Sequence, residues 1–184
     1  MAGLSERDEL PPIPGLAGHW GDRVANCPFC HGHEFAARPV AVLNASDHAH
    51  MLAAMLAPIA SDVHVLDPAD VEAVRADGDE LVLQLRDGGA RRVAGAFVVP
   101  VSSQRAPFAA QLGLALQPSG SVRIDGFGRT SLDGVYAAGD LAHSDAMPGP
   151  TWSLAGAIAA GQLAAVAIVQ RLAAASVEAH ASRP

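Results

Sequence analysis

Short apolar runs alternate with one helical segment in the first half of the sequence. Residues 38–44 and 62–66 form two such runs, and their length and polar boundaries are typical of strands buried in a sheet. Between them, residues 46–57 have helical composition, and Ser46 or Asp47 is available to cap the first turn. A strand–helix–strand order predicts a parallel sheet, because parallel strands need a crossover connection.

The middle of the chain has the pattern of an antiparallel meander. Extended segments are predicted at residues 70–74, 80–86 and 91–99. The turn sequences Asp77-Gly78 and Asp87-Gly88-Gly89 separate them. We therefore predict antiparallel pairing over residues 71–99, and a domain boundary in the polar connection at residues 100–107.

The last third holds two strand patterns and one long apolar run. Strands are predicted at residues 121–125 and 134–138, the second of which leads into a Gly-Asp turn. Residues 153–172 are almost all small and apolar, and the run is about long enough to span a bilayer. Because Ala and Gly dominate it and insert weakly, we expect a buried helix packed against a sheet rather than a membrane span. The whole pattern predicts an α/β fold, with residues 176–184 as a frayed tail.

Composition narrows the classes of function. The chain has 184 residues, half of them hydrophobic and 17% charged, which is enough for one ordinary domain or two small ones with a packed core. The net charge of −7, without a basic cluster, argues against nucleic acid as a partner. Residues 1–26 have the composition of a proline-rich loop, and residues 1–21 lack the pattern of a signal peptide. A cytoplasmic location is therefore expected.

Both cysteines fall in one stretch, Cys27-Pro28-Phe29-Cys30-His31-Gly32-His33-Glu34. Two sulfurs at this spacing form a small disulfide ring if Cys27 caps a helix and Cys30 lies one turn further on. A helix start also lowers the pKa of a thiol toward neutrality. His31 is available to take or give the proton that thiol–disulfide exchange requires. The stretch therefore predicts a redox-active pair.

Three other interpretations compete for these residues. The two thiols could be buried and purely structural. A zinc site would combine the cysteines with His31 or His33, and His48 and His50 are the nearby candidates for a second ligand pair. The C-x-x-C-H order is also the attachment pattern of covalent haem, which needs an exported chain. We rank the redox pair first, the structural thiols second, zinc third and haem last, and assign no metal site.

The cysteine stretch and a second motif together resemble a known family. P-P-I-P-G-L…W-G…C-P-F-C-H-G-H-E (residues 11–34) and T-S-L-D-G-V-Y-A-A-G-D (residues 130–140) resemble the low-molecular-weight thioredoxin-reductase-like flavoproteins. They are most similar to the subgroup with a C-P-[YF]-C-H-G motif, which includes dithiol oxidases of natural-product pathways. The resemblance covers most of residues 10–172. It implies an α/β, truncated two-domain flavoprotein disulfide reductase with Rossmann-type and ββα elements.

The resemblance also implies roles for the cysteine stretch. Cys30 would lie nearest the flavin and form the thiolate–flavin contact. Cys27 would be the interchange thiol that attacks the substrate disulfide, and His31 would be the acid/base.

A second set of residues would hold the FAD. Gly139 has no side chain to keep a ligand away from the backbone, and Asp140 projects an acceptor where strands of an α/β sheet end. In the family, Asp140 would hydrogen-bond the ribityl or diphosphate region of FAD. Trp152 and Ser153, at the start of the last helix, would face the flavin ring.

The chain departs from the family pattern at its nucleotide-binding turns. The sequence contains no G-x-G-x-x-G turn, which would hold the FAD diphosphate at a helix start. The glycine-rich turn expected after the first strand is replaced by Asn44-Ala45-Ser46-Asp47, and Asp67 stands where arginines would grip a 2′-phosphate. The sequence therefore indicates an incomplete FAD site and argues against NADPH binding by this polypeptide.

These expectations combine into one functional hypothesis and its alternatives. We expect a flavin-dependent thiol/disulfide oxidoreductase acting on a small dithiol or disulfide, or on a thioredoxin-like protein, as a homodimer or as the complement of a separate FAD half. The alternative is a non-catalytic truncated homologue that serves as a binding or assembly module; a flavin-independent dithiol protein ranks third. The expected organisation is a linker at residues 1–25, a shortened NAD(P)-domain-like segment at 26–100, part of an FAD domain at 101–175, and a tail at 176–184.

Overall fold

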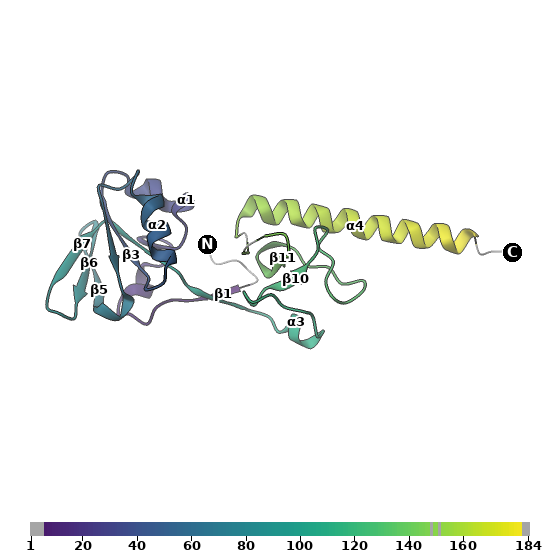
Figure 1. The fold of residues 1–184 in the computed structure, drawn as a ribbon, viewed down its shortest axis with the longest axis horizontal. Coiled ribbons are helices and arrows are strands. Elements are labelled where there is room, and N and C mark those ends of the chain that lie inside the picture. The colour runs from purple at the N-terminus through teal and green to yellow at the C-terminus, as the bar shows by residue number, and fades with distance from the viewer. Residues whose placement is uncertain (1–5, 148, 151, 182–184) are drawn as a thin grey trace. The chain divides into compact units, whose positions relative to one another are not determined.

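The chain divides into two compact units. The computed structural model describes residues 6–147, 149–150 and 152–181. One unit comprises Glu9–Val101, and the other comprises Ser102–Pro184 together with Met1–Asp8 (Figure 1). The α/β fold class predicted from the sequence is confirmed.

A four-stranded parallel sheet forms the centre of the unit Glu9–Val101. Its strand order is β2 (Val24–Ala25), β8 (Gly95–Val98), β3 (Pro39–Leu43) and β4 (Asp62–Leu66). Helix α2 (His48–Leu56) connects β3 to β4 and buries its apolar face against the sheet. The predicted strand–helix–strand unit and its parallel pairing are therefore confirmed.

The meander prediction is confirmed for three strands and wrong for the fourth segment. Strands β5 (Val71–Asp77), β6 (Glu80–Leu85) and β7 (Ala90–Val93) pair antiparallel in that order. Strand β8, however, leaves the meander and pairs with β2 and β3 in the parallel sheet. All four residues of β8 are buried, and such a strand is stable only where both faces are covered.

The segment before the cysteines is part of the core rather than a loop. A 3-10 helix (Leu16–His19) and strand β2 lie within it, and Leu16 and Val24 are fully buried against the meander strands. The Val74 N–H donates to the Pro14 carbonyl oxygen at 2.8 Å, which ties the segment to β5. The prediction of an irregular loop over residues 1–26 is therefore wrong for this part; residues 1–5 lie outside the described residues. The cysteine stretch follows as α1 (Pro28–His31) and a 3-10 helix (Gly32–Phe35).

The other unit is built from short elements and one long helix. Strand β1 (Glu6–Glu9) pairs with β9 (Val101–Gln104), and β10 (Val122–Ile124) pairs parallel with β11 (Ala142–Ser144). The helical elements of this unit are α3 (Phe108–Gln111), a 3-10 turn at Gly139–Leu141 and α4 (Leu154–Ala181). The unit Glu9–Val101 contains a further 3-10 turn, Pro68–Asp70. The predicted strand at 121–125 is confirmed as β10.

Two predictions for this unit are wrong. Residues 134–138 are not a strand, because their pairing is limited to an isolated bridge between Tyr136 and Arg129, and Gly134 lies in a turn with φ 80°. Helix α4 is not buried against a sheet either: Ala164 and Ala167 are its two buried residues. It also extends through most of the predicted tail, to Ala181. The last three residues, 182–184, lie outside the described residues.

By length and composition, α4 is apolar enough to cross a membrane. An 18-residue window of the helix has a mean hydropathy of 1.5, and 11% of that window is buried. A single helix of this kind is weak evidence for a membrane span.

Candidate functional site

The two cysteine sulfurs lie together at the start of α1. Cys27 is the extended N-cap residue, Pro28 follows as the first helical residue, and the Cys27 carbonyl oxygen accepts from the N–H groups of Cys30 and His31, both at 3.1 Å. The chain turns here because proline fits the first helical position, where its missing N–H is not needed. Cys30 thus lies one turn beyond Cys27, and the two Sγ atoms are 2.9 Å apart. The predicted local geometry of the pair is present, with both thiols free.

One of the two thiols holds its proton more tightly than usual. The pKa of Cys30 is raised, mainly because its S–H donates to Cys27 Sγ, and also because of partial desolvation and the neighbouring Cys27 sulfur. The expectation that the helix start lowers a thiol pKa is therefore wrong for Cys30. Cys30 is exposed and Cys27 is partly buried. Cys30 is thus the proton donor of the pair, and Cys27 Sγ is the acceptor.

Two residues next to Cys30, His31 and Phe29, differ in how far they are exposed. His31 ends α1, and its Nδ1 is buried without a hydrogen-bond partner among the described residues. No function was predicted for Phe29, which lies between the cysteines with 86% of its surface exposed. The signal that could have found it is a large apolar residue inside the C-x-x-C motif, directly before Cys30.

A zinc site at the cysteines would need histidine or carboxylate side chains gathered with them. Among the residues that the structure describes, no three or more His, Cys, Asp or Glu side chains are arranged to hold a metal ion.

In the turns that follow β3 and β4, side-chain oxygens accept hydrogen bonds from backbone N–H groups. Asn44 Oδ1 accepts from the Ser46 N–H at 2.9 Å, and Asp67 Oδ1 accepts from the Ala69 N–H at 2.8 Å. Free amides at such turns are what bind nucleotide phosphates. A phosphate at either turn would have to displace an internal hydrogen bond and, after β4, would meet a carboxylate.

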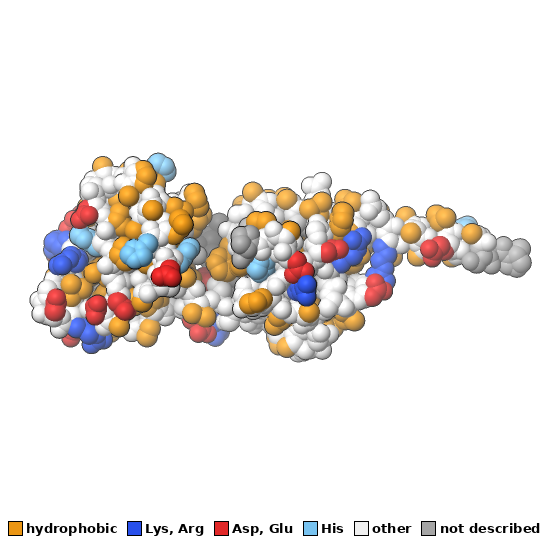
Figure 2. Space-filling model, in the orientation of Figure 1, with side chains coloured by type: hydrophobic (Ala, Val, Ile, Leu, Met, Phe, Trp, Pro, Cys, Tyr) orange, Lys and Arg blue, Asp and Glu red, His pale blue; other side chains and the backbone are white. Residues whose placement is uncertain are grey.

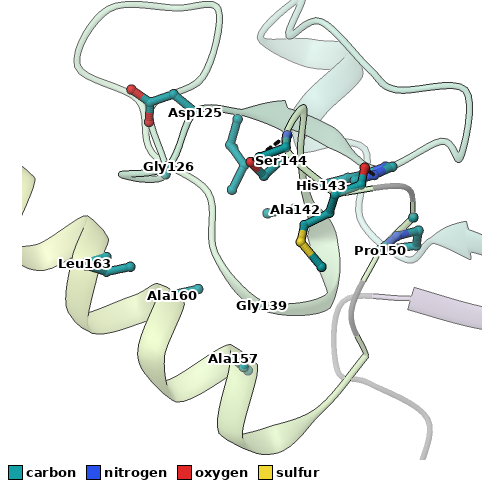
Figure 3. Close-up of a pocket in the computed structure, with 16 residues that line it drawn as sticks. Asp125, Gly126, Gly139, Ala142, His143, Ser144, Pro150, Ala157, Ala160 and Leu163 are labelled. Carbon is teal, nitrogen blue, oxygen red and sulfur yellow. Dashed lines mark hydrogen bonds between the residues drawn. The ribbon is translucent and has the colours of Figure 1, made fainter.

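The Gly-Asp turn lines a cavity in the unit that contains α4. The cavity has a volume of about 270 Å³ and lies between the Gly139 turn, strand β11 and α4. Figure 3 shows Ala157, Ala160 and Leu163 of α4 facing it from one side, with Gly139 and β11 on the other. Gly139 has φ 75°, and a Cβ placed there would lie 3.6 Å from the Ala157 Cβ, so the turn and the helix approach closely.

The structure brings one of the four predicted cofactor-binding residues to this cavity. Gly139 lines it, whereas Asp140, Trp152 and Ser153 are not among its lining residues. Ser153 instead caps α4, because its Oγ accepts from the Gly156 N–H at 3.0 Å.

His143 on β11 also lines the cavity and is held on both sides of its ring. It is 8% exposed, its Nδ1 lies 2.9 Å from Ser119 Oγ, and its Nε2 lies 3.1 Å from the Met147 carbonyl oxygen. A carbonyl oxygen only accepts, so Nε2 carries the proton and Nδ1 accepts from the hydroxyl. This histidine fixes the loop beside the cavity. Nothing in its sequence setting distinguished it from the other histidines.

The chain matches known proteins over most of its length. Residues 63–170 match the pyridine nucleotide-disulphide oxidoreductase family. The chain belongs to this family. The resemblance to thioredoxin-reductase-like flavoproteins stated from the sequence is therefore confirmed.

Several relatives within the family are thioredoxin reductases. Thioredoxin reductase aclT of Aspergillus oryzae is 39% identical over 95 residues, which are 50% of this chain and 27% of that protein. Thioredoxin reductase aclD of the same organism is 29% identical over 91% of this chain and 62% of that protein. The crystal structure of HlmI superposes with a TM-score of 0.80 at 27% identity, over 96% of this chain and 62% of that chain. This chain therefore spans less than two thirds of the length of these relatives.

Pyridine nucleotide-disulphide oxidoreductases of this kind bind FAD, whose diphosphate needs cationic side chains or free backbone amides. Among the described residues that line the cavity, Asp125 and His143 are the ionisable ones, and none is Arg. The carboxylate of Asp125 is already paired with Arg129. Among its described lining residues, the cavity therefore offers no arginine to the diphosphate of FAD.

Proposed function

We propose that this chain carries out thiol–disulfide exchange through Cys27 and Cys30, as the dithiol-bearing part of a flavin-dependent, thioredoxin-reductase-like oxidoreductase. The observation that supports this most directly is the 2.9 Å separation of the two sulfurs at a helix start. A small movement of one side chain joins sulfurs at this distance into a disulfide. Exposure of Cys30 gives a substrate access to the pair.

The exchange has two steps. The thiolate of one cysteine attacks a sulfur of a substrate disulfide R–S–S–R, which forms a mixed disulfide and releases R–S⁻. The second cysteine loses its proton and attacks the protein sulfur of the mixed disulfide, which releases the second R–S⁻. The pair is oxidised by two electrons, the substrate is reduced, and the two cysteine protons end on two R–SH molecules. The same steps in reverse oxidise a dithiol.

The roles within the pair follow from its hydrogen bond. The Cys30 S–H donates to Cys27 Sγ, and this hydrogen bond raises the pKa of Cys30, so Cys30 gives up its proton less readily than an ordinary cysteine. This supports Cys27 as the attacking thiol. We propose that His31 exchanges the proton with bulk water, since its ring lies at the end of the same short helix.

We further propose that FAD binds only when a second polypeptide supplies the diphosphate site. This polypeptide would be the complementary part of a longer relative, because a second copy of the chain lacks the same diphosphate-binding turn. The substrate would be a small dithiol or disulfide, or a thioredoxin-like protein, and the reaction would take place in the cytoplasm without NADPH.

Two measurements test this function. The reduced full chain, mixed with a small disulfide, is expected to lose both thiols and form an intrachain disulfide by intact mass. FAD is expected to bind when the part of aclD that this chain does not match is added, and flavin fluorescence reports the binding. A chain that stays reduced would refute the exchange, and a mixture that stays colourless after removal of free FAD would refute the flavin dependence.

The exposure of α4 supports a second candidate, a non-catalytic binding or assembly module. Only 11% of an apolar 18-residue window of the helix is buried, and large apolar side chains lie along it (Figure 2). Such a surface is typical of a site that another polypeptide covers. This candidate predicts association without turnover, and replacement of both cysteines by Ser would leave the association intact.

A further inference from the structure

Phe29 is the most exposed large apolar side chain in the unit that carries the cysteines. It is 86% exposed, whereas the other two phenylalanines of this unit, Phe35 and Phe97, are 6% and 0% exposed and pack edge to face in the core. The unit therefore has a core that holds aromatic rings, and Phe29 lies outside it.

The exposure of Phe29 does not result from a loosely attached helix. Pro28, its neighbour on α1, is buried, and so is Gly32 at the end of the helix. A Cβ placed on Gly32 would lie 3.4 Å from the Ile59 side chain and 3.6 Å from the Leu56 side chain. The inner face of α1 is thus packed on α2 and the residues after it, while Phe29 points outward.

A substrate that reacts with the pair must come close to this ring. Phe29 precedes Cys30 directly, so their Cα atoms are about 3.8 Å apart. Cys30 is also exposed. During exchange, the substrate sulfur bonds to Cys27 Sγ, which lies 2.9 Å from the Cys30 sulfur, and this brings the group attached to it near the phenyl ring of Phe29.

We propose that Phe29 is a specificity-determining residue that contacts the substrate and favours disulfides or dithiols carrying an aromatic or apolar group beside the sulfur. The inference rests on the proposed exchange reaction of Cys27 and Cys30. Its physical basis is the removal of the exposed ring from water and, for aromatic substrates, an edge-to-face or offset-stacked contact. A polar substrate gains neither.

The test uses the full reduced chain without flavin and compares two neutral disulfides, aromatic 4,4′-dithiodipyridine and polar 2-hydroxyethyl disulfide. Because each variant is compared with the wild type on the same probe, the different leaving groups cancel. Phe29→Ala is expected to slow reaction with the aromatic probe about fivefold to tenfold and to change the polar probe by less than about twofold. Phe29→Tyr, which keeps the ring, is expected to retain the wild-type preference.

Phe108→Ala is the matched control, because Phe108 is a 67% exposed phenylalanine on α3 in the other unit. It is expected to change neither rate. The inference is overturned if Phe29→Ala slows both probes equally, or neither. If the wild-type pair reacts with neither probe, the proposed exchange itself has failed, so the two failures are distinguishable.

Discussion

At the residue scale, one hydrogen bond gives the two chemically identical thiols of the cysteine pair different roles, one as donor and one as acceptor. Local sequence alone sets the spacing, because the proline and the helix start fix the backbone between Cys27 and Cys30. The hydrogen bond between them runs from the Cys30 S–H to Cys27 Sγ, and it raises the pKa of Cys30 above its ordinary value. Spacing predicted the pair, but it could not predict which member is the donor.

Removal of the acceptor is predicted to make Cys30 easier to ionise. In Cys27→Ala, the Cys30 S–H has lost the hydrogen bond that raises its pKa, so the pKa falls toward its ordinary value. The rate of alkylation of Cys30 by iodoacetamide, measured against pH, is expected to rise at lower pH than in the wild type. The control is Cys27→Ser, whose hydroxyl still accepts a hydrogen bond and is expected to shift the profile less. An unchanged profile in both variants would contradict the proposed donor role.

At the element scale, a glycine makes the segment before the cysteines fit the meander. Gly15 has φ 84°, and a Cβ there would lie 1.9 Å from the Val74 carbonyl oxygen. The sequence showed a proline-rich stretch at this point and predicted a loop. The segment became part of the core because Leu16 and Val24 are covered by strands distant in sequence.

Gly15→Ala is predicted to destabilise the chain by about 3 kcal/mol or more, because backbone strain and a clash with a backbone oxygen combine. The matched control is Gly78→Ala, at φ 62° with no atom within 4 Å of the added Cβ, which is expected to cost about 1 kcal/mol from strain alone. Urea unfolding followed by circular dichroism measures both. Equal effects of the two substitutions would show that Gly15 does not meet Val74.

An ion pair joins β10 to the turn that follows β11. Arg123 Nη2 lies 2.6 Å from Asp145 Oδ2, and this contact lowers the pKa of Asp145 and raises that of Arg123. A carboxyl whose folded-state pKa is depressed stabilises the fold above its unfolded pKa, and that contribution is lost as the pH falls through the folded-state value.

Asp145→Asn is therefore predicted to lower the melting temperature near neutral pH, and this difference is expected to shrink as the pH falls below the ordinary aspartate pKa of about 3.9 toward the lower folded-state value. Arg123→Gln is expected to give the same pattern, and the double variant is expected to be little worse than either single one. Melting curves across this pH range measure all three. A constant difference between Asp145→Asn and wild type at every pH would contradict the prediction. Because both side chains are about half exposed, the effect is expected to be small and weakened by salt.

At the scale of the whole molecule, α4 has an apolar surface that its own unit does not cover. Ile158, Val169 and Leu172 are each more than 60% exposed, and their spacing puts them on one face of the helix. Residues 153–172 were predicted to be buried because of their composition. Within the unit, α4 packs through the face that carries Ala164 and Ala167, and the opposite face stays uncovered.

We predict that this face carries association with a second copy or another polypeptide. Ile158→Gln with Val169→Gln replaces two exposed apolar side chains by good helix formers, so α4 is expected to stay folded while association weakens at least about tenfold. Sedimentation velocity measures the self-association. Val177→Gln, which changes a 68% exposed residue on a different face of α4, is the control. A wild-type chain that is monomeric alone and does not bind the complementary part of aclD would contradict this prediction.

The sequence by itself determined the local elements and the chemistry: the parallel strand–helix–strand unit, three strands of the meander, and the C-P-F-C turn with its paired sulfurs. These depend on residues close together in the chain, where periodicity, turn residues and proline act directly. The tertiary structure alone decided which sheet β8 joins, that residues 16–25 enter the core, that residues 134–138 pair at one isolated bridge, and that α4 keeps an uncovered face. Those outcomes depend on which distant surfaces meet, and burial of an apolar segment is a property of its neighbours rather than of its own composition.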